Sequence, residues 1–356
     1  MSILLTGGLG YIGSHTAVEL ISRGYDIVVV DNCVNSSRDM VDKISQVANT
    51  SIKHHLIDVS DVDELNTVFS KHSIEGVIHF AGFKSVSESV RYPRKYYSNN
   101  IGTALALLEV CERNGIKRVV FSSSASVYGN PLKVPIEECD PVGMCTSPYG
   151  WTKYIIERIL IDSANADEGL SIIILRYFNP IGAHESGLLG ENPISSPDNL
   201  FPCITQTAAG LREYLSIYGG NYPTRDGTGI RDYIHVTDLA KGHCAAIEYS
   251  KTHIGAEILN LGTGKGYSVN EVIRTFEEVT GASVPTRILE RRPGDISESY
   301  ACVKKAELIL GWRAEKTLEE MCIDAWRWQK NCSGTSYMIP KRESEGDILK
   351  RHHRIS

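Results

Sequence analysis

Short apolar, β-branched runs alternate with helix-like stretches in the first half of this chain, and this alternation constrains the fold more than any other feature. The runs carry little polar alternation, which is typical of strands buried on both faces of a sheet. A repeated strand–helix–strand order predicts a parallel sheet with right-handed crossovers and helices on both faces. We therefore predict an α/β fold with a doubly wound parallel sheet, with strands at 3–5, 27–30, 52–57, 77–80, 118–121 and 172–175 and helices at 12–22, 62–71, 96–114 and 148–164.

The regular alternation ends after residue 175, and this indicates a second, smaller part of the chain. Residues 180–232 are rich in Gly, Pro, Asn and Ser, which are typical of turns and loops. Further on, helices are predicted at 204–211, 236–248, 269–280 and 318–330, with a strand at 257–261. We expect residues 1–180, rejoined by 233–263, to form the larger domain, residues 181–330 a smaller C-terminal α/β domain, and residues 331–356 a polar tail.

Composition excludes several classes of protein. The 37 basic and 43 acidic residues give a net charge of −6, which argues against a general nucleic-acid binder or a polybasic membrane protein. No apolar run approaches the roughly 20 residues that span a bilayer. The nine cysteines are scattered without a Cys-x-x-Cys pair, which favours reduced thiols over a disulfide framework or a zinc site. We expect a cytoplasmic protein with no structural or catalytic metal.

A glycine-rich turn follows the first strand. Gly8, Gly10 and Gly13 fit the pattern G-x-G-x-x-G, and Gly7 precedes them. The turn lies between a strand and an amphipathic helix, which is the context that a dinucleotide site requires. Glycines allow a tight turn and a close approach of the backbone to pyrophosphate, and the helix N-terminus supplies N–H donors. The sequence therefore predicts a Rossmann-type dinucleotide site.

Acidic residues follow the next two strands. Asp31 lies 18 residues after Gly13, where a carboxylate accepts hydrogen bonds from both ribose hydroxyls. The same carboxylate repels a 2′-phosphate, so the predicted cofactor is NAD rather than NADP. Asp58 follows the third strand and is expected to meet the adenine.

A Tyr-x-x-x-Lys pair, Tyr149 and Lys153, begins the helix predicted after the strand that ends near Ser124. The pattern also occurs at Tyr300/Lys304 and Tyr337/Lys341, so context must decide. Ligands bind beyond the carboxyl ends of parallel strands, and residues i and i+4 share a helix face. The first pair meets both conditions. Ser124 either hydrogen-bonds the same phenol or caps the end of its strand.

This pair suits proton abstraction from a hydroxyl. A free tyrosine has a pKa of about 10, and bringing it to about 7 requires about 4 kcal/mol of preferential stabilisation of the phenolate. The Lys153 ammonium and a positively charged nicotinamide are both expected to contribute.

Several motifs together give a more specific indication. With Tyr149 and Lys153, the segments 6–15, 79–84, 122–129, 176–180, 227–236 and 260–262 resemble the UDP-glucose 4-epimerase family of extended short-chain dehydrogenases/reductases. The resemblance runs from about residue 1 to 330.

The resemblance implies an activity. Tyr149 takes the proton of the sugar 4-hydroxyl while hydride moves to a retained NAD, the 4-keto sugar turns over, and the returning hydride inverts C4. It also implies a homodimer formed through the helices at 96–114 and 148–164. The expected partners are UDP-sugars, with no nucleic acid and no membrane.

The resemblance further implies the site residues. Those expected at the cofactor are Gly7, Gly10, Tyr11, Ile12, Gly13, Asp31, Asn32, Asp58, Val59, Phe80, Ala81, Gly82, Lys84, Asn99, Ser124, Tyr149, Lys153 and Tyr177. Those expected at the UDP-sugar are Lys84, Ser124, Tyr149, Asn179, Asn199, Leu200, Tyr218, Arg231, Arg292, Asp295 and Ser299.

One position bears on substrate range. Ser299, four residues after Asp295, resembles a gate beside the sugar 2-position, where a small side chain also admits N-acetyl sugars. A register slip of one residue places Tyr300 at the gate and reverses this conclusion.

Three other readings compete. A sugar-nucleotide 4,6-dehydratase needs a further acid and base, whereas Ala125 and Ser126 occupy the positions after Ser124. A dehydrogenase that releases NADH at each turn is distinguished by whether turnover requires added NAD. A non-enzymatic NAD sensor is expected to lack Tyr149 or Lys153.

Overall fold

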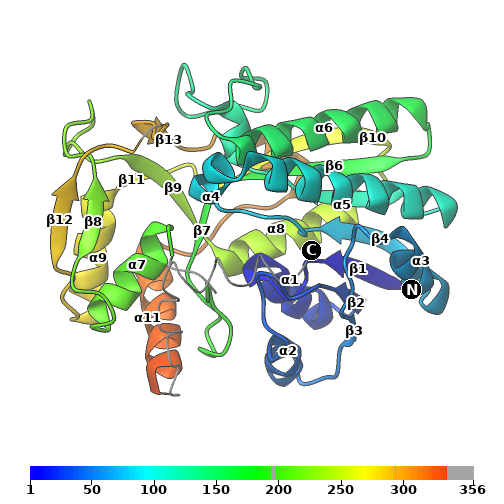
Figure 1. Cartoon of the computed structure of the whole chain (residues 1–356), viewed down its shortest axis with the longest axis horizontal. Coiled ribbons are helices and arrows are strands. Elements are labelled where there is room, and N and C mark those ends of the chain that lie inside the picture. The colour runs from blue at the N-terminus through cyan, green and yellow to red at the C-terminus, as the bar shows by residue number, and fades with distance from the viewer. Residues whose placement is uncertain (194–196, 293, 335–356) are drawn as a thin grey trace, which may run out of the picture.

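The computed structural model describes residues 1–193, 197–292 and 294–334. Seven parallel strands form its central sheet, in the spatial order β10-β6-β5-β4-β1-β2-β3 (Figure 1). The predicted doubly wound fold is confirmed. The strands are β1 (Ser2–Thr6), β2 (Asp26–Val30), β3 (Lys53–His55), β4 (Ile74–His79), β5 (Arg118–Ser122), β6 (Ser171–Tyr177) and β10 (Gly255–Leu261).

Helices cover both faces of this sheet, and this explains why its strands lack polar alternation (Figure 1). In β1, Ile3 and Leu5 face one apolar cluster whereas Leu4 faces the other. One cluster lies under α1 (Tyr11–Ser22), α2 (Met40–Ala48) and α8 (Val236–Tyr249). The opposite cluster lies under α3 (Val62–Lys71), α5 (Pro93–Arg113) and α6 (Pro148–Ala166).

A second group of elements packs around its own apolar core, which includes Phe201 and Phe276 (Figure 1). Its strands form a four-stranded sheet of β7 (Asn179–Ile181), β9 (Ile230–His235), β11 (Gly266–Ser268) and β13 (Glu298–Ser299), and a parallel pair of β8 (Leu215–Tyr218) and β12 (Thr286–Leu289). Its helices are α7 (Leu200–Ala208), α9 (Val269–Thr280) and α11 (Leu318–Gly334). Two short helices, α4 (Val86–Arg91) and α10 (Lys304–Leu310), complete the described elements.

The best-predicted helices carry clear caps. Both α3 and α9 begin and end at the predicted residues, because Asp61 caps the first and Ser268 forms a capping box with Glu271 in the second. In contrast, α7 begins four residues before the predicted start, and the elements α2, α4 and α10 were not predicted. The strands β7, β8, β9, β11, β12 and β13 were also missed.

The strand predicted at 257–261 is β10, which lies parallel to β6 at the edge of the central sheet. By contrast, residues 233–235 belong to β9 and pair with β7 and not with the central sheet. The final helix, α11, continues to Gly334, so residues 331–334 are helical rather than part of a tail. The remainder of the predicted tail, 335–356, lies outside the described residues.

A buried ion pair joins α6 to the central sheet. Arg176 of β6 donates to both carboxylate oxygens of Glu157, through Nε at 3.0 Å and Nη2 at 2.6 Å. Both side chains are almost fully buried, at 3% and 2% exposure. A pair of this kind is very sensitive to loss of one partner, since the remaining charge stays buried without compensation.

Replacing Arg176 with Met should therefore lower the free energy of unfolding by about 3–5 kcal/mol. Replacing both partners with apolar residues, Arg176→Met and Glu157→Leu, should recover most of this loss because no buried charge remains. Urea denaturation followed by circular dichroism measures both. A double variant no more stable than the single one would contradict this account.

Candidate active site

The glycine-rich turn is packed too closely for any side chain. Gly7 has φ +68°, and a Cβ there would lie 2.7 Å from the backbone nitrogen of Ala81, beyond β4. A Cβ on Gly13 would lie 2.5 Å from the carbonyl oxygen of Gly7. Gly10 precedes α1 and offers no side-chain cap, so the N-terminal N–H groups of the helix receive no side-chain acceptor from this residue. The turn therefore has the features of an anion site at a helix N-terminus, beside Tyr11 and Ile12.

Two acidic residues lie together beyond β2 and β3. Asp58 accepts a 2.9 Å hydrogen bond from Asn32, the residue after Asp31. Although burial alone would raise it, hydrogen bonds from Ser60 and Asn32 lower the pKa of Asp58. The buried Asp31 carboxylate accepts from three donors, the N–H groups of Leu9 and Cys33 and the hydroxyl of Ser36. The hydrogen bond from the Leu9 N–H thus fixes Asp31 against the glycine-rich turn. Val59, the residue after Asp58, is buried.

The segment after β4 packs against the glycine-rich turn. The Phe80 ring lies 4.8 Å from the ring of His243, between centroids, and Ala81 contacts Gly7. Gly82, with φ +149°, would place a Cβ 3.1 Å from Asn100 Oδ1. That oxygen also accepts from Asn99 Nδ2 at 3.0 Å, so Asn99 lies near the segment after β4.

Tyr149 and Lys153 lie in the first two turns of α6, and both are buried, at 7% and 6% exposure. Lys153 Nζ donates to the carbonyl oxygen of Ser122 at 2.7 Å and lies 5.9 Å from the centroid of the Tyr149 ring. The Ser124 hydroxyl accepts from the Ser126 N–H at 3.2 Å and so caps a short 3₁₀ turn that follows β5. Its side chain also acts to lower the pKa of Tyr149.

The chain alone does not lower the pKa of the phenol. Burial, with the nearby Tyr177 hydroxyl, raises the pKa of Tyr149 well above its usual value, although the Ser124 hydrogen bond opposes this. Burial also lowers the pKa of Lys153 to about 8, against the attraction of Glu157. The expected lowering of the Tyr149 pKa is therefore not a property of the chain by itself.

His79, at the end of β4, carries an unusually low pKa that the sequence did not reveal. Burial and then the nearby Lys153 lower its pKa to about 3, and its Nδ1 is 2.7 Å from Thr6 Oγ1. Between pH 3 and 6.5 the unfolded chain thus binds a proton at this position that the folded chain excludes.

Stability should accordingly fall as pH drops below 6.5, by about 1.4 kcal/mol per pH unit from this residue. In a His79→Asn variant, the free energy of unfolding relative to wild type should rise by about 2 kcal/mol between pH 7 and pH 5. Urea titrations at each pH measure it. A difference that stays constant across this range would show that His79 is not the group responsible.

Residues expected at the UDP-sugar form two groups in the second part of the chain. In one, the Arg292 guanidinium lies 4.5 Å over the Tyr218 ring, and its Nε donates to Asp295 at 3.1 Å. In the other, Arg231 of β9 is the register partner of Ser299 in β13. Asn179 begins β7, which also pairs with β9.

A carboxylate missed by the sequence analysis joins the cofactor side to the sugar side. Glu191 accepts from Lys84 Nζ at 2.8 Å and from Asn199 Nδ2 at 2.9 Å. Burial works against the charge of Lys84, but Glu191 raises its pKa. Asn199 occupies the N-cap position of α7, which begins at Leu200, but its side chain makes no capping hydrogen bond. Glu191 stands in an irregular segment whose sequence offers no periodicity, so only the fold reveals its contacts.

The two candidates for the gate take different positions. Ser299 is buried, at 7% exposure, whereas the Tyr300 ring packs on β11, where a Cβ on Gly266 would lie 2.9 Å from it. Ser299 is the last residue of β13, and Tyr300 follows the strand. The second Tyr-x-x-x-Lys pair, Tyr300/Lys304, thus lies outside the catalytic group, and Tyr337/Lys341 lies outside the described residues.

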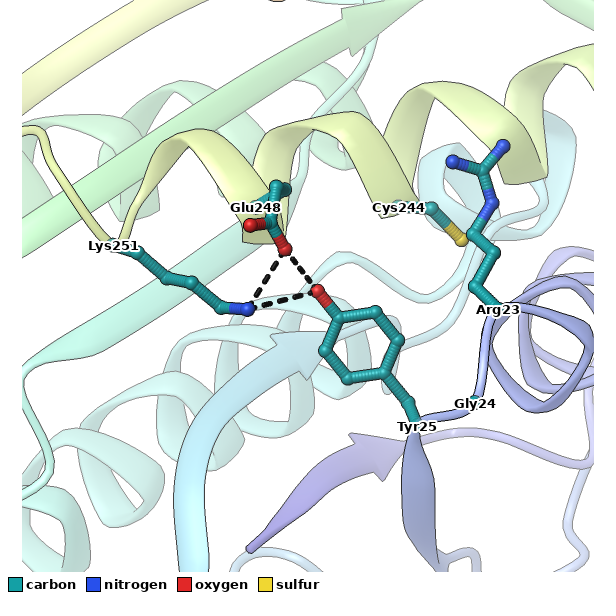
Figure 2. Close-up of a pocket in the computed structure, with 6 residues that line it drawn as sticks. All are labelled: Arg23, Gly24, Tyr25, Cys244, Glu248 and Lys251. Atoms are coloured by element: carbon teal, nitrogen blue, oxygen red, sulfur yellow. Dashed lines mark hydrogen bonds and ion pairs between the residues drawn. The ribbon is translucent and has the colours of Figure 1, made fainter.

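A pocket of about 410 Å³ lies away from these residues, at the amino end of β2 (Figure 2). In it, the Tyr25 hydroxyl donates to Glu248, and Lys251 Nζ approaches both side chains. Tyr25, Glu248 and Lys251 thus hydrogen-bond one another. None of the predicted site residues lines this pocket.

Comparison with known proteins agrees with this geometry. Residues 3–262 match the model of the NAD dependent epimerase/dehydratase family. The chain belongs to this family. NAD is accordingly its cofactor, and no helix among residues 1–193, 197–292 and 294–334 is both long and apolar enough to cross a bilayer.

Individual relatives are similar over most of their length. UDP-glucose 4-epimerase of Bacillus subtilis is 51% identical over 331 residues, covering 93% of this chain and 97% of the relative. The crystal structure of UDP-glucose 4-epimerase from Bifidobacterium longum with NAD⁺ and UDP is 47% identical with a TM-score of 0.90, covering 93% and 98%. A UDP-Glc/GlcNAc 4-epimerase structure from Campylobacter jejuni is 35% identical with a TM-score of 0.80, covering 93% and 99%.

Proposed function

We propose that this chain is a UDP-glucose 4-epimerase that inverts C4 of UDP-hexoses and retains its NAD. The observation that carries this proposal is the buried pair of Tyr149 and Lys153, which lies with the half-buried Ser124 at the carboxyl end of β5 in a dinucleotide-binding fold. The 51% identity to a UDP-glucose 4-epimerase over 93% of the chain supports it.

The residues that surround the glycine-rich turn suit NAD. The N-terminus of α1 and the backbone of Gly7 and Gly10 are proposed to receive the pyrophosphate, because glycines allow the tight turn and Gly10 leaves the helix N-terminus without a side-chain cap. Asp31 is proposed to receive the adenine ribose, with Asn32, Asp58 and Val59 beside the adenine. When bound, NAD accepts a hydride from C4 of the sugar and returns it, so that the sugar passes through a 4-keto stage.

The chain's own contribution is to move a proton at the Tyr149 oxygen. Tyr149 takes the proton of the 4-hydroxyl and later returns it, and Ser124, which acts to lower the pKa of the phenol, is proposed to hydrogen-bond it during this transfer. Lys153 is anchored at the Ser122 carbonyl, 5.9 Å from the Tyr149 ring, where its charge favours the phenolate. Since burial raises the pKa of Tyr149 in the chain alone, we infer that proton abstraction begins only after cofactor and sugar are bound.

Inversion requires that the site binds UDP tightly and the sugar weakly. Arg292 and Arg231 are proposed to bind the two charges of the diphosphate, since guanidinium groups offer bidentate contacts. Lys84, Tyr177, Asn179, Asn199, Leu200, Tyr218 and Asp295 complete the proposed contacts.

The chain is further proposed to work as a homodimer that pairs through α5 and α6. It is also proposed to divide into an NAD-binding part, residues 1–178 with 236–263, and a UDP-sugar part that takes the other residues up to 330, because β7 and β9 pair with each other and not with the central sheet. Sedimentation velocity of the purified protein decides the first point: a monomer at micromolar concentration would refute it.

Tyr149→Phe removes only the phenol oxygen and should lower kcat for UDP-galactose by at least about a hundredfold. Retained NAD, measured by absorbance after denaturation, should stay at the wild-type level because the ring still fills its place. Tyr154→Phe, on the same helix, is the matched control and should keep kcat. Near-wild-type activity of the Tyr149 variant would place the base elsewhere.

We also propose that the enzyme accepts UDP-N-acetyl sugars, because Ser299 is small and buried while the Tyr300 ring packs on β11. Ser299→Tyr should abolish conversion of UDP-N-acetylgalactosamine and spare UDP-galactose, because the larger ring fills the space for the acetamido group. Chromatography of the products, without added NAD, measures both. Equal loss of both activities would refute the gate, and a wild type that converts only UDP-galactose would refute the wider range.

A further inference from the structure

Three consecutive serines stand at the end of β5, and two of them hydrogen-bond residues of α6. The Ser122 carbonyl oxygen accepts from Lys153 Nζ at 2.7 Å. The fully buried Ser123 hydroxyl donates to Glu157. Two positions on one helix, one turn apart, are thus joined to two successive residues of one strand end, next to Ser124.

Glu157 itself cannot move freely. It lies one helical turn after Lys153 and is 1% exposed. Its two oxygens are held by Arg176, with Nε at 3.0 Å and Nη2 at 2.6 Å. Arg176 is in turn oriented by the Tyr128 hydroxyl, which accepts from Nη1 at 3.0 Å, and by the carbonyl oxygen of Glu138 at 3.3 Å. The carboxylate therefore presents a fixed acceptor to Ser123.

The same network extends toward the sugar side. The Tyr128 hydroxyl donates to Asn260 Oδ1 at 2.7 Å, and Asn260 donates to the carbonyl oxygen of Ile136 at 2.9 Å. The Ile136 N–H donates to the carbonyl oxygen of Tyr300, next to Ser299. A continuous set of hydrogen bonds thus connects Glu157 both to the strand end beside the catalytic pair and to the segment next to the proposed gate.

Stability alone gives a poor reason for this arrangement, because a buried ion pair is often no more stabilising than an apolar pair of similar size. The hydrogen bond from Ser123 to Glu157 gives a better reason. A shift of about 1 Å at a reacting group can lower the rate about a hundredfold, so a fixed strand end has direct value for proton transfer.

We propose that Glu157, fixed by Arg176, is a positioning residue that holds the end of β5 through Ser123, and so keeps Tyr149 and Lys153 in register for proton transfer. This inference rests on the proposed epimerase activity. It assigns Glu157 no contact with sugar or cofactor.

Ser123→Ala cuts this link while leaving the ion pair intact, and it is compared with Ser250→Ala. Ser250 is also a buried serine, with its hydroxyl bonded to the Ile247 carbonyl oxygen at 2.7 Å, at the end of α8 away from the strand-end serines. In the complete protein with its retained NAD, Ser123→Ala should lower kcat for UDP-galactose about tenfold. The KM and the amount of retained NAD should stay within twofold, and the pH profile of kcat should shift. Ser250→Ala should match wild type in all of these measurements.

A kcat within twofold of wild type for Ser123→Ala would overturn the inference, and so would an equal fall for Ser250→Ala. Should Ser123→Ala fail to fold, Ser123→Cys keeps the volume with a much weaker donor and should show the same fall in kcat. Inactive but folded wild-type protein would refute the proposed function instead, so the two failures are distinguishable.

Discussion

The close approach of the glycine-rich turn to the end of β4 is the constraint on which the rest of the site depends. The strand order reverses between β1 and β4, and Gly7 brings the backbone after β1 against Ala81 at this point. A side chain at Gly7 or Gly13 would push apart the two strands or lift α1 from the sheet. Because both contacts are backbone to backbone, the helix N-terminus is available beside the carboxyl ends of the strands, where ligands bind in such folds.

Around this point the site is assembled from elements that belong to different parts of the chain. The end of β5 and the start of α6 supply the groups proposed to move the proton, while the ends of β2 and β3 supply the acids proposed to bind the nucleoside. The second group of elements supplies Arg231 and Arg292, which are proposed to bind the diphosphate. Glu191 joins these two sides, since it accepts from both Lys84 and Asn199.

Burial disfavours the charged forms of both Tyr149 and Lys153. It raises the pKa of Tyr149 and lowers that of Lys153 to about 8, so at neutral pH the phenol stays protonated while Lys153 keeps its positive charge. Glu157 opposes the effect of burial on Lys153. The chain therefore places a cation 5.9 Å from the Tyr149 ring, and we propose that the further positive charge of bound NAD is needed before the phenol loses its proton.

The sequence by itself determined the central sheet, the glycine-rich turn, Asp31 and the pairing of Tyr149 with Lys153, because these depend on local periodicity and on spacing within one strand–helix unit. It also predicted α3 and α9 to the residue, since their caps lie next to them in the chain. Only the tertiary structure decided the partners of Glu157, Glu191 and His79, and the opposite placements of Ser299 and Tyr300. Those contacts join residues far apart in sequence or lie at the end of a two-residue strand. Neither leaves a periodic signal, because burial and pairing arise only when separate elements meet.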